Sequence, residues 1–239
     1  ACRSRMPGGR LLTTALLGTR AYASSQHTLL PADALSITSL LYALSPPPQL
    51  VAIVTGGGTQ IAPWLLATPG ASNTVLELSM PYAHASLASI LGTKPDRSCT
   101  SDVASLLATR AYERCLELGG GDRAVGLGCT AALRSVPMKR GDHRCFVAVR
   151  TAHGVYSLAL TLAKGARTRS REDAVVSRAA LATLARACGQ EPPTLSGGVE
   201  FWRLAADDPT ATAEAAAWLD EEEAIEAFEP AGGAGECVS

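Results

Sequence analysis

Apolar positions along the chain follow two periodicities, and each periodicity predicts one kind of element. Runs of consecutive or alternating apolar residues predict strands at 50–54, 74–80, 124–129, 144–151 and 154–165. Segments in which apolar residues recur every three or four positions predict helices at 31–45, 59–68, 83–92, 98–121 and 169–189.

The order of these elements indicates the fold class. Strands and helices alternate up to residue 129, and the strands at 144–151 and 154–165 then form a β-hairpin around the turn Ala152-His153-Gly154. Alternating elements build parallel strands with helices on both faces, whereas a hairpin adds antiparallel strands. We therefore predict an α/β protein, a three-layer α/β/α sandwich with a mixed sheet.

The two ends of the chain differ from the middle. Residues 1–30 contain four arginines and many hydroxylated residues but no acidic one. Such a start is typical of an organelle transit peptide, and a disordered tail is the alternative. We expect a mitochondrial protein, with the plastid as the alternative location. Residues 191–239 are expected to form an acidic extension, partly helical and then disordered.

Composition narrows the classes of partner. The formal net charge is −1 without a clustered basic face, so no nucleic-acid partner is expected. No apolar run approaches the ~20 residues that a membrane helix needs, so no membrane partner is expected either. The seven cysteines include no C-x-x-C pair. We therefore expect free thiols in a reducing compartment and no metal site, unless residues distant in sequence assemble one.

The segment after the first predicted strand carries the candidate chemistry. The apolar run at 50–54 leads into Thr55, which Gly56, Gly57 and Gly58 follow before a helical pattern begins. A hydroxyl at a strand end can act as a nucleophile. Glycine N–H groups at a helix start can bind a phosphate or an oxyanion. The alternatives are that Thr55 caps the helix and that the glycines form a turn without a ligand.

Three stretches appear together in a known order: IVTGGG at 53–58, TPGASNTVLELSMPYAHASLASILG at 68–92 and AVGLGCTAAL at 124–133. They resemble the motifs of the CinA C-terminal domain family, whose bacterial members include nicotinamide-nucleotide amidases. Eukaryotic relatives share PGASNT, GDHR and KGART, all present here. The resemblance implies a CinA C-terminal-like domain over 31–190. In such relatives a nucleotidyltransferase-like module can follow this domain.

The resemblance also implies site residues. The family attacks the carboxamide of nicotinamide mononucleotide with a serine that a tyrosine and a lysine assist. A gapless match places Thr55 on the serine, Tyr82 on the tyrosine and Leu87 on the lysine. Aligning the T-G-G triplets instead places Ile53 on the serine. Leu87 cannot take a proton, and losing a base typically lowers a rate by ~10²–10⁴-fold. The resemblance therefore favours a degenerate amidase pocket.

Ligand contacts are expected from five residues: Gly56, Gly57, Gly58, Ser72 and Arg144. Ser72 either faces the pocket or ends a turn. Arg144 either pairs with a ligand phosphate or is a charged residue at a strand entry on the surface.

We expect the domain to bind a pyridine nucleotide or a similar small ligand, without a cofactor. One alternative is a weakly active nicotinamide-nucleotide amidase, a C–N hydrolase that releases ammonia. The other is a non-catalytic interaction module in an organelle assembly, as a homo-oligomer or with a partner domain.

Overall fold

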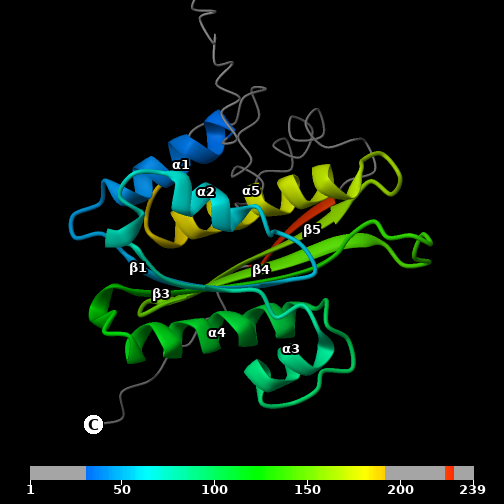
Figure 1. Cartoon of the computed structure of the whole chain (residues 1–239), viewed down its shortest axis with the longest axis horizontal. Coiled ribbons are helices and arrows are strands. Elements are labelled where there is room, and N and C mark those ends of the chain that lie inside the picture. The colour runs from blue at the N-terminus through cyan, green and yellow to red at the C-terminus, as the bar shows by residue number, and fades with distance from the viewer. Residues whose placement is uncertain (1–30, 192–223, 229–239) are drawn as a thin grey trace, which may run out of the picture.

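The computed structural model describes residues 31–191 and 224–228, and Figure 1 shows their arrangement. One sheet of six strands has the order β2-β1-β3-β4-β5-β6. Its strands are β1 (Gln49–Thr55), β2 (Val75–Ser79), β3 (Ala124–Ala132), β4 (His143–Thr151), β5 (Gly154–Leu162) and β6 (Ala224–Phe228). The helices are α1 (Ala32–Tyr42), α2 (Ile61–Ala67), α3 (His84–Leu91), α4 (Ser101–Glu117) and α5 (Arg169–Ala187), with short 3-10 turns at Ala71–Asn73 and Gly121–Arg123.

The sheet is mixed. Strand β1 runs parallel to both β2 and β3, whereas β4, β5 and β6 are each antiparallel to the strand before them in the sheet. Helices α1, α2 and α5 cover one face, and α3 and α4 cover the other (Figure 1). The predicted three-layer α/β/α sandwich with a mixed sheet is confirmed.

Burial on both faces explains the unbroken apolar run of β1. Leu50, Ala52 and Val54 pack into the cluster that α1, α2 and α5 contribute to. Val51 and Ile53 point the other way and pack with apolar residues of α3 and α4. Since successive side chains of a strand point to opposite faces, a strand between two helical layers needs apolar residues at every position.

Two glycines of β3 bring α4 onto the sheet. A Cβ added to Gly126 would lie 2.2 Å from the backbone nitrogen of Tyr112, and one added to Gly128 would lie 2.3 Å from the carbonyl oxygen of Ala104. Either distance is far below van der Waals contact. The backbone of α4 therefore rests directly on β3, which only glycine allows at these two positions.

Side-chain caps fix the starts of the two long helices. The Thr100 hydroxyl accepts the N–H of Val103 at 3.2 Å and so begins α4, while Ser98 lies before the cap. The Thr168 hydroxyl accepts the N–H of Arg171 at 3.3 Å and begins α5. Thr100 is therefore the N-cap of α4.

The C-terminal extension differs from expectation in the part that the structure describes. Residues 224–228, expected within a partly helical segment, form β6, which pairs with β5 from Thr161 to Ser157. Residues 1–30, to which the transit-peptide prediction applies, lie outside the described residues, as do the rest of the extension's residues, 192–223 and 229–239.

Candidate functional site

A cavity of about 270 Å³ opens beside the carboxyl ends of β1 and β3. These two parallel strands are neighbours, with Thr55 opposite Thr130. From β1 the chain passes through α2 on one face to β2, and it then reaches β3 through α3 and α4 on the other face. Ligands of open α/β sheets bind where successive connections change face in this way. We call this cavity the carboxyl-end cavity.

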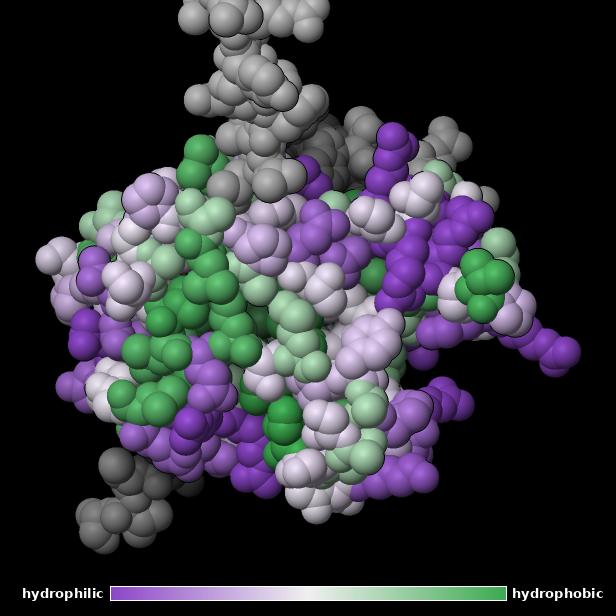
Figure 2. Space-filling model, in the orientation of Figure 1, coloured by the Kyte–Doolittle hydropathy of each residue, from purple (hydrophilic) through white to green (hydrophobic). Residues whose placement is uncertain are grey.

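Cationic side chains line the carboxyl-end cavity. Lys139 comes from the connection between β3 and β4, and Arg169 from the first position of α5. The imidazole of His84, at the first position of α3, lines the cavity beside them. Among the residues that the structure describes, no aspartate or glutamate lines it. Figure 2 shows hydrophilic side chains around the hollow at the right of the molecule, between the start of α5 and α3. The cavity is therefore suited to an anion.

Thr55 and Tyr82 line this one cavity, as the resemblance requires. The Thr55 hydroxyl donates to the carbonyl oxygen of Pro81 at 2.7 Å, and only 6% of Thr55 is exposed. Leu87 also lines the cavity, 2% exposed, at the position where the family has its lysine. A carbonyl cannot take a proton from a hydroxyl, and neither can a leucine. Thr55 is therefore a poor nucleophile in this arrangement.

Ile53, the other candidate for the serine position, is apolar and buried against α3 and α4. It has no atom that could attack a carbonyl. Of the two matches, only the gapless one places a possible nucleophile, Thr55, at the position of the family's serine.

The glycine turn is shaped mainly by packing. Gly56 lines the cavity with φ of 76°, and a Cβ there would lie 2.0 Å from the carbonyl oxygen of Ala131. Gly57 and Gly58 are buried, the first against Leu133, where a Cβ would lie 2.5 Å away. The turn therefore needs glycine whether or not a ligand binds.

The expectation that these glycines open a helix is wrong, because α2 begins at Ile61. The backbone N–H groups just before it, those of Thr59 and Gln60, donate to the carboxylate of Asp173 at 3.1 and 3.2 Å. The Thr59 hydroxyl donates to the same carboxylate at 2.9 Å. The anion at this turn is thus a side chain of α5, and a ligand phosphate has no access to these donors.

Two predicted ligand residues lie away from the cavity. Ser72 is exposed in the 3-10 turn that precedes β2, at the end of the sheet opposite to Thr55. Arg144 lies on β4 opposite Ala132, and its guanidinium stacks over the ring of Phe146 at 5.7 Å. Neither residue lines the carboxyl-end cavity. Of the five residues, only Gly56 does.

Arg169 is the main residue that the sequence did not reveal. Its Nη2 donates to the carbonyl oxygen of Gly56 and to the hydroxyl of Tyr82, each at 3.1 Å, and its Nη1 donates to the carbonyl oxygen of Arg134 at 2.9 Å. It follows directly after the KGART segment, which was the available signal. Arg169 therefore joins the glycine turn and Tyr82 to the connection between β3 and β4.

The same turn of α5 supports that connection from within the protein. One oxygen of Glu172 accepts the N–H of Arg134 at 2.7 Å, and the other lies 2.6 Å from Nδ1 of His143. The side chains of Glu172 and His143 are completely buried. Nε2 of His143 has no hydrogen-bond partner in the described part of the chain. Glu172 thus holds both ends of the segment that carries Lys139.

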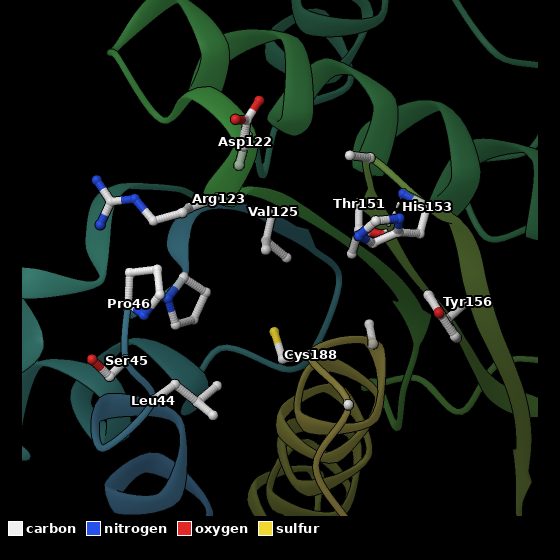
Figure 3. A pocket seen from close by; sticks show the side chains of 15 residues that line it. Leu44, Ser45, Pro46, Asp122, Arg123, Val125, Thr151, His153, Tyr156 and Cys188 are labelled. Atoms are coloured by element: carbon white, nitrogen blue, oxygen red, sulfur yellow. Dashed lines mark hydrogen bonds between the residues drawn. The ribbon is translucent and has the colours of Figure 1, made fainter.

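A second, larger cavity of about 490 Å³ lies at the amino ends of β1 and β3 (Figure 3). We call it the amino-end cavity. The sulfur of Cys188 points into it, between Pro46 on one side and Thr151 and His153 on the other. Burial raises the pKa of the Cys188 thiol to about 12. Asp122 and Arg123 of the 3-10 turn before β3 lie at its rim, so its charges balance.

Within 31–191 and 224–228, no group of three His, Cys, Asp or Glu side chains could hold a metal ion. No helix in these ranges is long and apolar enough to cross a bilayer.

Comparison with known proteins identifies the fold. No protein-family model and no curated protein sequence matches the chain. The competence/damage inducible protein CihA from Agrobacterium tumefaciens is 18% identical, with a TM-score of 0.51 over 67% of this chain and 98% of that one. A CinA superfamily protein from Escherichia coli is 19% identical, with a TM-score of 0.49 over 65% and 92%. The expected CinA-like fold is confirmed.

Proposed function

We propose that this CinA-like domain binds a small anionic ligand, a pyridine nucleotide in the first place, in the carboxyl-end cavity. The observation that supports this most is the charge of the lining. Lys139 and Arg169 enter the cavity with His84, and no carboxylate of the described residues opposes them. Both Nη2 protons of Arg169 are donated within the protein, so Arg169 contributes mainly its permanent positive charge, and Lys139 adds a point charge on a flexible stem.

The size of the cavity limits the ligand. Its volume of about 270 Å³ lies just below the ~300–1,000 Å³ that small-molecule sites usually have. A mononucleotide suits this volume better than a dinucleotide. Leu87 and Ala131 give the wall an apolar part against which a ring can lie. The resemblance to nicotinamide-nucleotide amidases makes nicotinamide mononucleotide the first ligand to test.

Calorimetric titration with nicotinamide mononucleotide, the corresponding nucleoside and inorganic phosphate tests the proposal. We expect binding of the mononucleotide, weaker binding of inorganic phosphate, and the weakest binding of the nucleoside, because the phosphate carries the charge that Lys139 and Arg169 meet. Equal affinity for the nucleoside and the mononucleotide would contradict an anion site.

A weakly active amidase is the second candidate, because Thr55 and Tyr82 share the cavity. We expect the unmodified chain to release little ammonia from nicotinamide mononucleotide, since Leu87 offers no base. Leu87→Lys, which places an amine where the family has one, is expected to raise any trace activity by up to ~10²–10⁴-fold. Ammonia is measured with a coupled assay, and Leu87→Met serves as the control without a base. Robust turnover by the unmodified chain that Thr55→Ala abolishes would replace the binding function with the amidase.

A further inference from the structure

The carboxyl-end cavity contains a second hydroxyl, that of Ser98, which lies beside a possible base, whereas Thr55 does not. Oγ of Ser98 lies 3.5 Å from Nδ1 of His84, and both side chains line the cavity. An imidazole is the usual base for a serine nucleophile in hydrolases. The hydroxyl of Thr55, in contrast, is bonded to the carbonyl oxygen of Pro81.

The sheet and α4 hold Ser98 in place. The Thr130 hydroxyl, on β3, donates to the carbonyl oxygen of Ser98 at 2.6 Å. Thr130 itself is 1% exposed and lies opposite Thr55. Two residues after Ser98, Thr100 caps α4. The serine backbone is therefore anchored on both sides, although its side chain reaches the cavity.

His84 is held by α3. It is the first residue of that helix, and Leu87 and Leu91 bury the helix against α4. The histidine begins α3, and the serine lies in the connection just before α4, which packs on α3. A contact of 3.5 Å is long for a hydrogen bond, but serine–base contacts in empty sites are often long and shorten when substrate binds.

We infer that Ser98 and His84 form a nucleophile–base pair that hydrolyses an ester or a carboxamide of an anionic substrate. The substrate class rests on the proposed function, since Lys139 and Arg169 would hold the anionic group. The nucleophile does not rest on it, because Ser98 and His84 are side by side without a ligand.

The reaction balances with water as the only co-reactant. His84 takes the proton of Ser98 Oγ while the oxygen forms a bond to the carbonyl carbon. The tetrahedral intermediate then expels the alcohol or amine, which takes the proton from His84. Water attacks the acyl-serine, giving its proton to His84, and the proton returns to Ser98 Oγ as the carboxylic acid leaves.

The described contacts give His84 no carboxylate partner to orient it, so the reaction is expected to be slow. Catalytic triads lose ~10⁴-fold in rate when the carboxylate is replaced. Covalent labelling is therefore a sharper readout than turnover, because it needs a single event per molecule.

The test is labelling of the full chain with a fluorophosphonate, followed by peptide mass spectrometry. We expect the label on Ser98, none in Ser98→Ala, and a rate lower by ~10²–10⁴-fold in His84→Gln. Ser86→Ala is the matched control, since Ser86 lies exposed on α3 outside the cavity and should not affect the rate. Label on Thr55, or no label on Ser98 in a folded chain, overturns the inference.

A pair of ester substrates tests the substrate class. We expect 4-nitrophenyl hemisuccinate, which carries a carboxylate, to be hydrolysed faster than neutral 4-nitrophenyl propionate, and Lys139→Ala to reduce this preference, since Arg169 remains. Equal rates in the unmodified chain overturn the anionic substrate class. Titration with nicotinamide mononucleotide separates the two proposals: binding without labelling of Ser98 refutes only the nucleophile, and labelling without binding refutes only the pyridine-nucleotide site.

Discussion

The carboxyl-end and amino-end cavities lie at the two ends of the same strands, β1 and β3, but their linings differ. The amino-end cavity is the larger, about 490 against 270 Å³, yet its rim balances Asp122 against Arg123. The carboxyl-end cavity has Lys139 and Arg169, without a carboxylate from the described residues. The comparison teaches that charge separates the two cavities in the opposite order to volume, and the proposed ligand site follows the charge.

The two ends also differ in how the protein supports them. Behind the carboxyl-end cavity, Glu172 and Asp173 of α5 accept hydrogen bonds from the two chain segments that form its wall. The amino-end cavity is walled by Pro46, Pro48 and the half-buried thiol of Cys188. Buried hydrogen bonds fix geometry, as the proposed binding site at the carboxyl end requires.

The largest difference is expected in stability. Glu172→Ala leaves the backbone N–H of Arg134 and the ring of His143 buried without their partner, so we expect a loss of about 3–5 kcal/mol in the free energy of unfolding. The matched carboxylate at the other end is Asp122, which is exposed, and Asp122→Ala should leave stability unchanged within error. Urea unfolding measures both. Similar losses for the two variants would show that α5 does not support the cavity wall.

The next difference concerns the thiol at the amino end. With its pKa raised to about 12 by burial, Cys188 has a thiolate fraction at pH 8 that is ~10³-fold below that of a thiol of pKa 9. Iodoacetamide should therefore alkylate Cys188 ~10³-fold more slowly in the native chain than in urea. Because only the thiolate reacts, the native rate should rise about tenfold per pH unit above pH 8. Fast native alkylation, followed by mass spectrometry, would show an open and polar cavity.

Ligand affinity should separate the two arginines. Arg169→Ala removes a cation from the carboxyl-end cavity, so we expect nicotinamide mononucleotide to bind ~10–100-fold more weakly. Arg123→Ala removes a cation from the other end and should leave the affinity unchanged. Calorimetry on both variants compares them under one condition. A loss in Arg123→Ala alone would move the ligand site to the amino-end cavity.

The smallest difference is expected for two buried threonines. Thr55→Val removes a hydrogen bond of 2.7 Å to Pro81, whereas Thr151→Val removes a long bond of 3.5 Å to Gly154 and the acceptor of the His153 N–H at 3.1 Å. We expect a loss of about 1 kcal/mol in the free energy of unfolding for each variant. Binding of nicotinamide mononucleotide should survive Thr55→Val, because the cations supply the affinity. A loss of binding with retained stability would make the Thr55 hydroxyl a ligand contact.

The helices and strands of the core were predictable because burial requires apolar side chains at regular positions along each of them. The strand expected at 50–54 is observed as Gln49–Thr55, and the helix expected at 169–189 as Arg169–Ala187. A strand that has a core on each of its faces needs apolar residues at every position, and this pattern is visible in a single sequence. Strand β6 was missed because its segment is rich in alanine and glutamate, which favour helices when read locally.

The sequence predicted residues of the carboxyl-end cavity only where the motifs of the resemblance contain them. Thr55 and Tyr82 belong to motifs that the resemblance covers. Arg169 and Lys139 reach the cavity from distant elements, and an arginine or lysine near a helix start or in a loop is more often solvated. Asp173 looks like an ordinary acid near the start of its own helix, yet its carboxylate binds the N–H groups that precede α2. Such contacts depend on packing between helices, which no local pattern records.

The glycines at 126 and 128 also limit how the protein can move. Where two backbones touch without intervening side chains, a helix can neither slide along the strand nor tilt without a clash. Helix α4 and strand β3 should therefore fluctuate as one body, and their amides should exchange with deuterium only during global unfolding. The middle of the connection between β3 and β4, with exposed Lys139, makes no such backbone contact, whereas Glu172 holds both of its ends. Motion at the carboxyl-end cavity is therefore expected in this connection and not in α4.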